Sequence, residues 1–437
     1  MVMRLNKAYF LVIFLLTPTF FTAIIIIELQ EKDIKKIDIS LFNSGVSHDE
    51  YNQSITYQVE ISFTLTHKEI APQTYMMHIA RYMDRDPDNP LTPYTPSYQD
   101  LELKEYQISG YSTTPTTSHD RFNNTFDNFN ATLTTAGTYE ISAYYKYEVK
   151  LSEIYFNDIS DSDIGNYDTS SNLYKTYCPG SKKYYETNDT DLISASNSIV
   201  DPDDNPIEKA EKIYNWVIDY LDYDENLPAK EKGASWAYDN KRGDCSEFSS
   251  LMITLLRIQG IPARKVLGFV LSADPTYRPE VGDKWEYTLT YDGDTQTSKS
   301  SFLGHAWVEY YVPNIGWIAC DPTWGKEGFN YFNRIDFFHL ASTVGEWINF
   351  SDGVNCSEFP FIPAPAYPDK PDAGKAFDFQ VSANIEVLDT DYKSNELDFW
   401  TLVIIIIIIV ACIITIISII IIIKRRKKRL EIAANFE

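Results

Sequence analysis

Two long apolar stretches without a charged residue constrain this chain most. One runs from Phe399 to Ile423, is dominated by isoleucine, and is followed by six basic residues at 424–429. About 20 apolar residues span the hydrocarbon core of a bilayer, and a basic cluster after such a span stays on the cytoplasmic side. The sequence therefore predicts a transmembrane helix at 399–423 and a basic cytoplasmic tail at 424–437.

The other apolar stretch runs from Ala8 to Ile27, with Arg4 and Lys7 before it. We interpret residues 1–27 as a signal anchor, which would be a second transmembrane helix, or as a cleaved signal peptide. The length of the stretch and the absence of a good cleavage site near its end favour the anchor. Both interpretations predict a membrane-embedded protein whose main domains, within 28–398, are extracytoplasmic.

The region between the two stretches is strongly acidic. The chain has 38 basic and 62 acidic residues, of which two basic residues precede position 28 and six basic and two acidic residues follow position 398. The remaining region therefore has a net charge of −30. Such a charge argues against nucleic acid or anionic lipid as a partner. It serves solubility, or it attracts divalent cations or basic substrates.

The five cysteines are Cys178, Cys245, Cys320, Cys356 and Cys412. Cys412 lies in the predicted span, and Cys320 alternates onto the apolar side of a predicted strand. Cys178 and Cys356 could form a disulfide outside the cell. The chain has no CxxC motif or Cys/His cluster, so we expect no structural zinc site.

Six Asn-x-Ser/Thr sequons occur between the apolar stretches, and they make the chain a glycoprotein candidate. They begin at Asn52, Asn123, Asn130, Asn188, Asn349 and Asn355.

The spacing of apolar residues divides the region between the two apolar stretches into a part with strand-like alternation and a part that begins with helical spacing. Polar and apolar residues alternate in 57–66 and 131–149, which is typical of half-buried antiparallel strands. We therefore predict a β-sandwich-like domain at 28–156, followed by a polar linker at 157–204. From Pro206 onward apolar residues recur at helical spacing. Strand-like segments follow at 264–271, 285–291, 305–312 and 317–321.

A cysteine begins the second predicted helix, which covers 245–259. Gly243 precedes it and permits an unusual backbone angle. The N-terminus of a helix carries partial positive charge and free N–H groups, which favour the reactive thiolate of Cys245. Alone this signal is weak, because most such cysteines are inert apolar residues.

A histidine and an aspartate could complete a nucleophilic site. A thiol nucleophile needs a base such as His305, and a carboxylate such as Asp321 fixes the imidazole and stabilises its charged form. With an even hairpin loop Asp321 would point away from His305. An odd loop or a bulge would place Asp321 opposite Trp307, diagonal to His305 and about 7–8 Å away between backbones. The site therefore requires an odd loop or a bulge.

Three motifs together resemble the transglutaminase-like family. They are Gly243-Asp-Cys-Ser-Glu-Phe with Leu255-Leu-Arg-Ile-Gln-Gly-Ile-Pro-Ala-Arg264, Gly304-His-Ala-Trp-Val-Glu-Tyr-Tyr-Val, and Gly316-Trp-Ile-Ala-Cys-Asp-Pro-Thr323. By this resemblance Cys245 is the nucleophile, His305 the base and Asp321 the orienting acid. The implied fold is α+β: a papain-like transglutaminase core preceded by the antiparallel β-sandwich-like domain.

The resemblance implies a transglutaminase-like domain at 205–370, followed by a juxtamembrane β or linker segment at 371–398. The expected protein is a membrane-anchored cysteine enzyme that acts on amide or peptide bonds of protein or peptide substrates through a thioester. The backbone N–H of Cys245 or the indole of Trp236 would stabilise the oxyanion. This chemistry needs no metal or organic cofactor. A non-catalytic surface scaffold and a membrane-tethered maturation factor remain the alternatives.

Overall fold

The computed structural model describes the greater part of the region between the two apolar stretches and a few isolated segments elsewhere. The described residues are 8–15, 22–29, 49–68, 72–83, 89–92, 98–134, 140–181, 183–227, 231–345, 348–349, 355–356, 377–392, 407, 414–415 and 424–425. The chain divides into two compact units, Met1–His48 and Asp49–Glu437.

The N-terminal unit contains a β-hairpin where a helical anchor or a signal peptide was expected. Its strands, β1 (Ala8–Leu15) and β2 (Thr22–Leu29), pair antiparallel. The β-branched residues that make this stretch apolar also favour strands, so apolar composition alone does not distinguish a helix from a strand. The span predicted at 399–423 lies outside the described residues except for 407, 414 and 415. No helix within the described part of the chain is long and apolar enough to cross a membrane.

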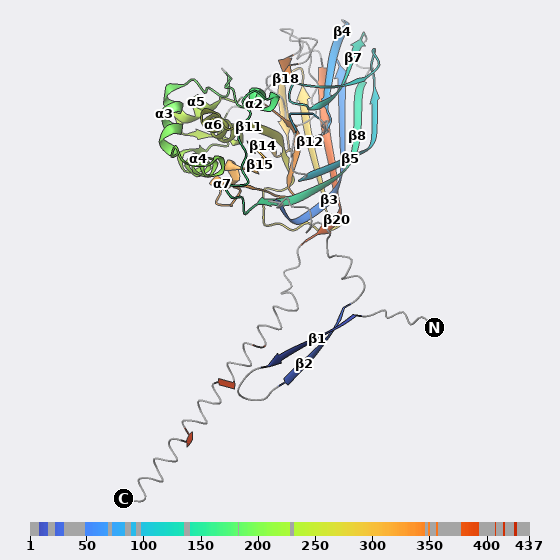
Figure 1. The fold of residues 1–437 in the computed structure, drawn as a ribbon. Coiled ribbons are helices and arrows are strands. Elements are labelled where there is room, and N and C mark those ends of the chain that lie inside the picture. The colour runs from blue at the N-terminus through green and yellow to red at the C-terminus, as the bar shows by residue number, and fades with distance from the viewer. Residues whose placement is uncertain are drawn as a thin grey trace, which may run out of the picture. The chain divides into compact units, whose positions relative to one another are not determined.

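A large antiparallel sheet dominates the second unit (Figure 1). Its strand order is β13-β12-β20-β3-β8-β16, and β5 also pairs with β8. The strands are β3 (Asp49–His67), β5 (Gln99–Ser109), β8 (Glu140–Phe156), β12 (Lys284–Asp292), β13 (Thr297–Ser300), β16 (Arg334–Ile335) and β20 (Phe377–Asp391).

A three-stranded sheet shares a core with this large sheet. It has the order β4-β7-β6, with β4 (Gln73–Ala80), β6 (Thr116–His119) and β7 (Thr125–Leu133). Alternate apolar residues of both sheets, among them Ile61 on β3, Met77 on β4 and Phe129 on β7, form one buried cluster. Period-two alternation therefore creates this interface.

A second core lies between a four-stranded sheet and the helices. The sheet order is β15-β14-β11-β17, and every pairing is antiparallel. The strands are β11 (Ala263–Val270), β14 (Gly304–Val312), β15 (Gly316–Cys320) and β17 (His339–Val344). The helices are α2 (Asn172–Tyr177), α3 (Thr190–Ile199), α4 (Pro206–Tyr220), α5 (Ala234–Asn240), α6 (Cys245–Ile258) and α7 (Pro322–Lys326).

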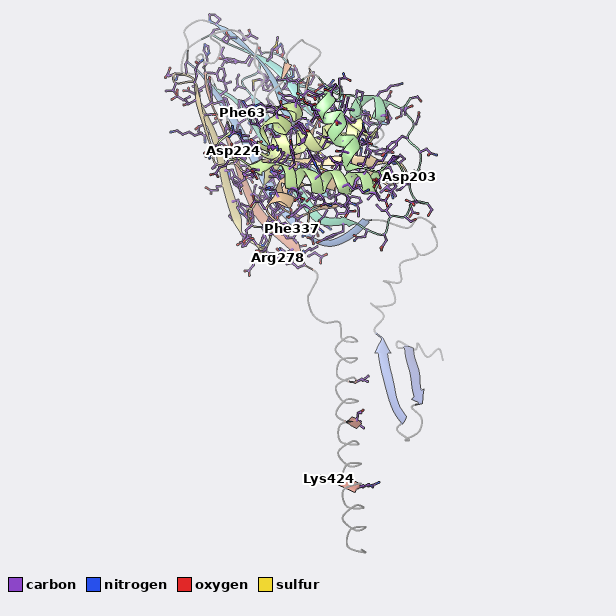
Figure 2. The ribbon with its side chains drawn as sticks, turned by 90° about the vertical axis from the view of Figure 1, so that its left-hand side faces the viewer. Phe63, Asp203, Asp224, Arg278, Phe337 and Lys424 are labelled. Carbon is purple, nitrogen blue, oxygen red and sulfur yellow. The ribbon has the colours of Figure 1, made fainter. Side chains whose placement is uncertain are left out.

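Helix α6 is the central element of this part of the fold. It packs against α3, α4, α5 and α7 and against β11 and β14. Phe248, Leu251 and Leu255 on α6 are fully buried. In Figure 2 the labelled Phe63 lies on the large sheet, and Asp203, just before α4, lies on the helical side.

The two cores are continuous through the four-stranded sheet. On β11 Val266 belongs to the helical core and Phe269 to the core of the large sheet, and on β17 Ala341 and Leu340 divide in the same way. The large sheet also combines β3 and β8 with β12 and β20, which come much later in the chain. The expected boundary at 156 therefore does not separate independent sheets.

The segment expected to be a linker at 157–204 contains α2 and α3. Leu173 on α2 and Leu192 on α3 are buried in the helical core. The polar residues that suggested a linker include the helix N-caps Ser171 and Asp189, whose side chains accept bonds from backbone N–H groups.

The suggested disulfide is not formed, and one of the six sequons is buried. Cys178 is a free, buried thiol, so the suggested disulfide with Cys356 is not formed, and nothing is described of the Cys356 side chain. The sequon at Asn123 is inaccessible in the folded chain, because this asparagine is only 1% exposed.

Candidate active site

Cys245 is the first residue of α6 and is partly exposed. The N-cap Asp244 accepts a bond from the N–H of Ser246, and Glu247 bonds back to the N–H of Asp244. This capping box fixes where the helix begins and therefore where the thiol lies. In the sequence this capping box is indicated by Asp244 and Glu247, which lie three positions apart.

Glycine is required at position 243 because Glu247 lies too close to leave room for a side chain. A Cβ at this position would lie 2.2 Å from the Cβ of Glu247. Gly243 is not among the described glycines with positive φ, so the predicted reason, an unusual backbone angle, is wrong. The buried Glu247 has its pKa raised to about 7, by burial and by the neighbouring Asp244.

The hairpin between β14 and β15 meets the register condition for the site. Val312 pairs with Gly316 and Val308 pairs with Cys320. The loop is therefore three residues long, which is odd, and the same register carries Asp321 opposite Trp307. The structure confirms this prediction, and Asp321 lies diagonal to His305.

His305 and Asp321 are in direct contact. His305 Nε2 lies 2.6 Å from Asp321 Oδ2, and the two side chains are 6% and 0% exposed. Burial lowers the pKa of His305, but Asp321 and a hydrogen bond with Cys245 outweigh it and raise the pKa to about 9. Because Asp321 occupies Nε2, Nδ1 is the ring nitrogen left for the thiol.

The carboxylate of Asp321 accepts four hydrogen bonds. Its Oδ1 accepts from the N–H groups of Thr323 (2.8 Å) and Trp324 (3.1 Å), as the N-cap of α7. Its Oδ2 contacts His305 and also His339 Nε2, at 3.1 Å. Burial raises the pKa of Asp321, but the two histidines outweigh it and hold the pKa well below the usual range.

Sequence reasoning missed His339 and Asp336. His339 Nδ1 lies 2.6 Å from Asp336 Oδ1, and Asp336 also accepts bonds from the N–H of Phe338 and the hydroxyl of Tyr331. The available signal was the i, i+3 pair Asp336 and His339 in a chain with only six histidines.

A glycine on the central strand lets the two histidines meet. On β11 Gly268 pairs with His305 of β14, and Val270 pairs with His339 of β17. Since side chains two residues apart share a face, His305 and His339 lie on the same face with Gly268 beside them. Their ring centroids are 5.5 Å apart.

Trp236, the candidate oxyanion donor, lies on α5 and is partly exposed. Its ring lies under the guanidinium of Arg242, and its carbonyl accepts a bond from Asn240. These contacts do not engage the thiol, so a catalytic role for its indole stays a prediction.

His305, Asp321 and His339 also provide metal-ligand atoms within 4.8 Å of one another. The Asp321 oxygen already lies at hydrogen-bonding distance from both ring nitrogens. A cation bound by all three atoms would have to replace both bonds. The arrangement therefore fits a hydrogen-bonded relay of acids and bases better than a metal centre.

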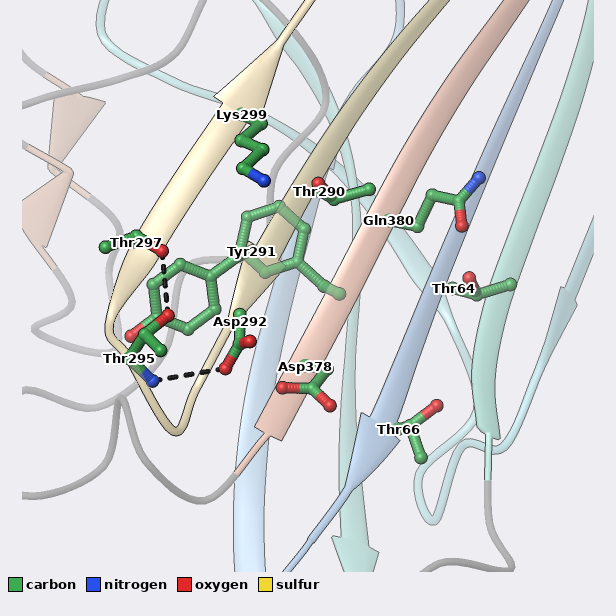
Figure 3. A pocket seen from close by; sticks show the side chains of 11 residues that line it. Thr64, Thr66, Thr290, Tyr291, Asp292, Thr295, Thr297, Lys299, Asp378 and Gln380 are labelled. Carbon is green, nitrogen blue, oxygen red and sulfur yellow. Dashed lines mark hydrogen bonds between the residues drawn. The ribbon is translucent and has the colours of Figure 1, made fainter.

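A separate hollow of about 550 Å³ lies on the large sheet (Figure 3). Threonines, Asp292, Asp378 and Lys299 of β3, β12, β13 and β20 and of the β12–β13 turn line it. Cys245, His305 and Asp321 are not among its lining residues, so it is distinct from the thiol site.

Residues 193–322 match the family model described as the transglutaminase-like superfamily. This range contains Cys245, His305 and Asp321. This part of the chain is therefore a transglutaminase-like domain.

Two curated proteins are similar to part of this chain. The uncharacterized protein YebA of Bacillus subtilis is 35% identical over 88 residues, and a protein-glutamine gamma-glutamyltransferase of Pseudomonas aeruginosa is 33% identical over 87 residues. Each match covers 20% of this chain, and the matches cover 10% and 11% of the relatives. The chain therefore spans only about a tenth of the length of these two relatives.

Among solved structures, the chain is similar to the periplasmic domain of TgpA from Pseudomonas aeruginosa bound to ethylmercury. That match has 15% sequence identity and a TM-score of 0.27, and it covers 61% of this chain and 90% of that one.

Proposed function

We propose that this chain is a cysteine acyl-transfer enzyme acting on carboxamide or peptide bonds. The observation that supports this most is the buried His305, which hydrogen-bonds with Cys245 and, through its other ring nitrogen, with Asp321. Thiol acyl transfer requires a nucleophile, a base that takes its proton, and an acid that orients the base.

In the first half-reaction the proton of Cys245 passes to His305, giving a thiolate and an imidazolium. Since the pKa of His305 is about 9, the imidazolium persists at neutral pH. The thiolate attacks the carbonyl carbon and forms a C–S bond. The imidazolium then protonates the leaving nitrogen, the C–N bond breaks, and ammonia or an amine departs from a thioester.

In the second half-reaction an amine or water attacks the thioester. Neutral His305 takes the proton of the attacking group, the C–S bond breaks, and the thiolate is restored. An amine yields a new amide bond, and water yields deamidation or cleavage. Asp321 holds the imidazole in place and balances its charge in both halves.

The helix N-terminus offers an oxyanion donor. Asp244 caps the N–H groups of Ser246 and Glu247 through its side chain, and its carbonyl accepts from the N–H of Phe248. The N–H of Cys245 takes no part in these bonds and points with the helix dipole toward a developing negative charge. It is the donor we favour over Trp236.

We also propose that the enzyme is anchored in the membrane with its site outside the cytoplasm. The isoleucine-rich stretch at 399–423 and the basic residues after it support this topology. In this proposal the papain-like core and the β-sandwich-like sheets face extracytoplasmic protein or peptide substrates.

The test uses the full-length chain with a library of glutamine-containing peptides and a primary amine. Mass spectrometry then follows amine incorporation, deamidation and cleavage. Products that disappear in Cys245→Ala and persist in Cys178→Ala, which removes another free thiol, support the proposal. Amine incorporation identifies a transglutaminase, and deamidation or cleavage identifies a hydrolase. Products that are absent or unaffected by Cys245→Ala contradict it and favour a non-catalytic scaffold.

A further inference from the structure

His339 occupies a second position on the carboxylate that orients His305. Asp321 Oδ2 lies 2.6 Å from His305 Nε2 and 3.1 Å from His339 Nε2. The oxygen is therefore shared, and any charge on His339 acts on Asp321 at hydrogen-bonding distance. His339 is 0% exposed, so water does not screen this interaction.

Both ring nitrogens of His339 face carboxylates. Nδ1 lies 2.6 Å from Asp336 Oδ1, while Nε2 faces Asp321. A neutral imidazole has one N–H and can donate to only one of them, whereas an imidazolium donates to both. The geometry therefore requires a protonated His339. Burial lowers its pKa, but Asp336 and Asp321 outweigh it and raise the pKa to about 9.

Asp336 is itself fixed in place. It accepts bonds from the N–H of Phe338 and from the Tyr331 hydroxyl. Burial raises its pKa, but His339 and Tyr331 outweigh it and lower the pKa. Asp336 therefore remains an anion and supplies the counter-charge that keeps His339 protonated.

The surroundings of His339 contain few other titratable groups. Asp336 and Tyr331 approach from the segment between α7 and β17, Asp321 from the end of β15, and His305 from β14. Trp307 and Trp324 cover the ring, with centroids at 5.1 and 4.9 Å.

We propose that His339, charged by Asp336, is a positioning residue that anchors Asp321, offsets part of its negative charge, and so sets the upper pH limit of the Cys245–His305 ion pair. This inference rests on the proposed function. His339 does not touch the reacting atoms in it. The positive ring at 5.5 Å opposes protonation of His305 and keeps the imidazolium acidic enough to release its proton to the leaving group.

The test is the pH dependence of Cys245 alkylation by iodoacetate in the full-length chain. This anionic reagent reacts best while His305 is positively charged, so the rate should fall as His305 loses its proton, near the pKa of about 9. In His339→Gln the pH at which the alkylation rate falls should rise by about 1 unit or more. The exposed His119 serves as the control, and His119→Gln should leave that pH unchanged.

The outcomes separate the two claims. A falling limb in the wild type that does not move in His339→Gln overturns the inference and leaves the proposed function standing. A wild-type profile with no falling limb, and with Cys245 no more reactive than an ordinary thiol, overturns the proposed function itself.

A second measurement does not depend on the variant folding. Nitrogen–proton correlation NMR of the histidine rings in the wild-type chain reports the protonation of each ring, and His339 is identified by its through-space contacts with the rings of Trp307 and Trp324. His339 should carry protons on both nitrogens at neutral pH. A neutral His339 would overturn the inference.

Discussion

At the scale of single residues, Asp321 joins several parts of the site. One carboxylate caps α7, orients His305 and balances His339. One oxygen of the Asp321 carboxylate caps α7, and the other contacts His305. A movement of α7 would therefore also move the carboxylate that orients the His305 ring.

Replacing Asp321 with asparagine separates these roles. The amide oxygen can still cap α7, but the amide has no charge and turns N–H groups toward two histidines. The pKa of His305 should fall, and the rate of Cys245-dependent acyl transfer should drop by roughly 10²–10⁴-fold. Steady-state kinetics of Asp321→Asn measures this. A variant within about threefold of wild type would contradict the role of Asp321.

The two buried histidines should make stability depend on alkaline pH. Both have a folded-state pKa of about 9, above the unfolded value of about 6.5. Their stabilisation is therefore fully present below about pH 6.5 and is lost as pH rises through about 9. We expect the free energy of unfolding in urea to decrease by a few kcal/mol between about pH 6.5 and pH 10.

His339→Gln should make this decrease in unfolding free energy at alkaline pH smaller, and His119→Gln should leave it unchanged. A free energy of unfolding that stays constant over the same pH range would show that the imidazoles are not held in their charged form.

At the scale of secondary-structure elements, β11 holds the site together. It pairs with β14 on one side and β17 on the other, and so places His305 opposite Gly268 and His339 opposite Val270 on one face of the sheet. The pairing with β17 has an irregularity at Leu267/Gly268. A Cβ at Gly268 would lie 2.0 Å from the backbone oxygen of Leu340.

Gly268→Ala should therefore displace β17. We expect a loss of about 1–3 kcal/mol in unfolding free energy and weaker contact between His339 and Asp321. Denaturant unfolding together with histidine NMR checks both effects. Ser298→Ala, on the exposed strand β13, is the control. An alanine variant with unchanged stability and unchanged His339 signals would contradict this account of Gly268.

Local patterns predicted the elements that carry the first three site residues. Helical spacing from Pro206, the capping residues around Cys245 and the odd β14–β15 loop are all short-range signals. His339 was missed because its place depends on β17 pairing with β11, about 70 positions earlier, and no local pattern encodes that pairing. The β1–β2 stretch was ambiguous because its isoleucines suit a strand as well as a helix.

At the scale of the unit Asp49–Glu437, the sheets and the helical core form a continuous structure. The pairing of β20 with β3 joins residues more than 300 positions apart, and β11 and β17 contribute to both buried cores. The large sheet therefore supports the strands that carry His305 and His339. Sequence alternation identified its strands but not the partners that complete it.

This continuity predicts one cooperative unfolding transition for the unit. Leu340→Ala removes an apolar side chain from the core of the large sheet and should cost about 2–5 kcal/mol. Far-ultraviolet circular dichroism and the exposure of the buried thiols Cys178 and Cys320 should shift together. Two separate transitions, with only one shifted by this variant, would contradict the prediction.

The most direct test of the central claim is detection of the acyl-enzyme. The full-length chain is mixed with p-nitrophenyl acetate, quenched in acid and mapped by mass spectrometry. We predict a hydroxylamine-sensitive acetyl thioester on Cys245 that is absent in Cys245→Ala and forms at least about 100-fold more slowly in His305→Gln. Acetylation that never reaches Cys245, or that reaches it at the same rate without His305, would contradict the proposed mechanism.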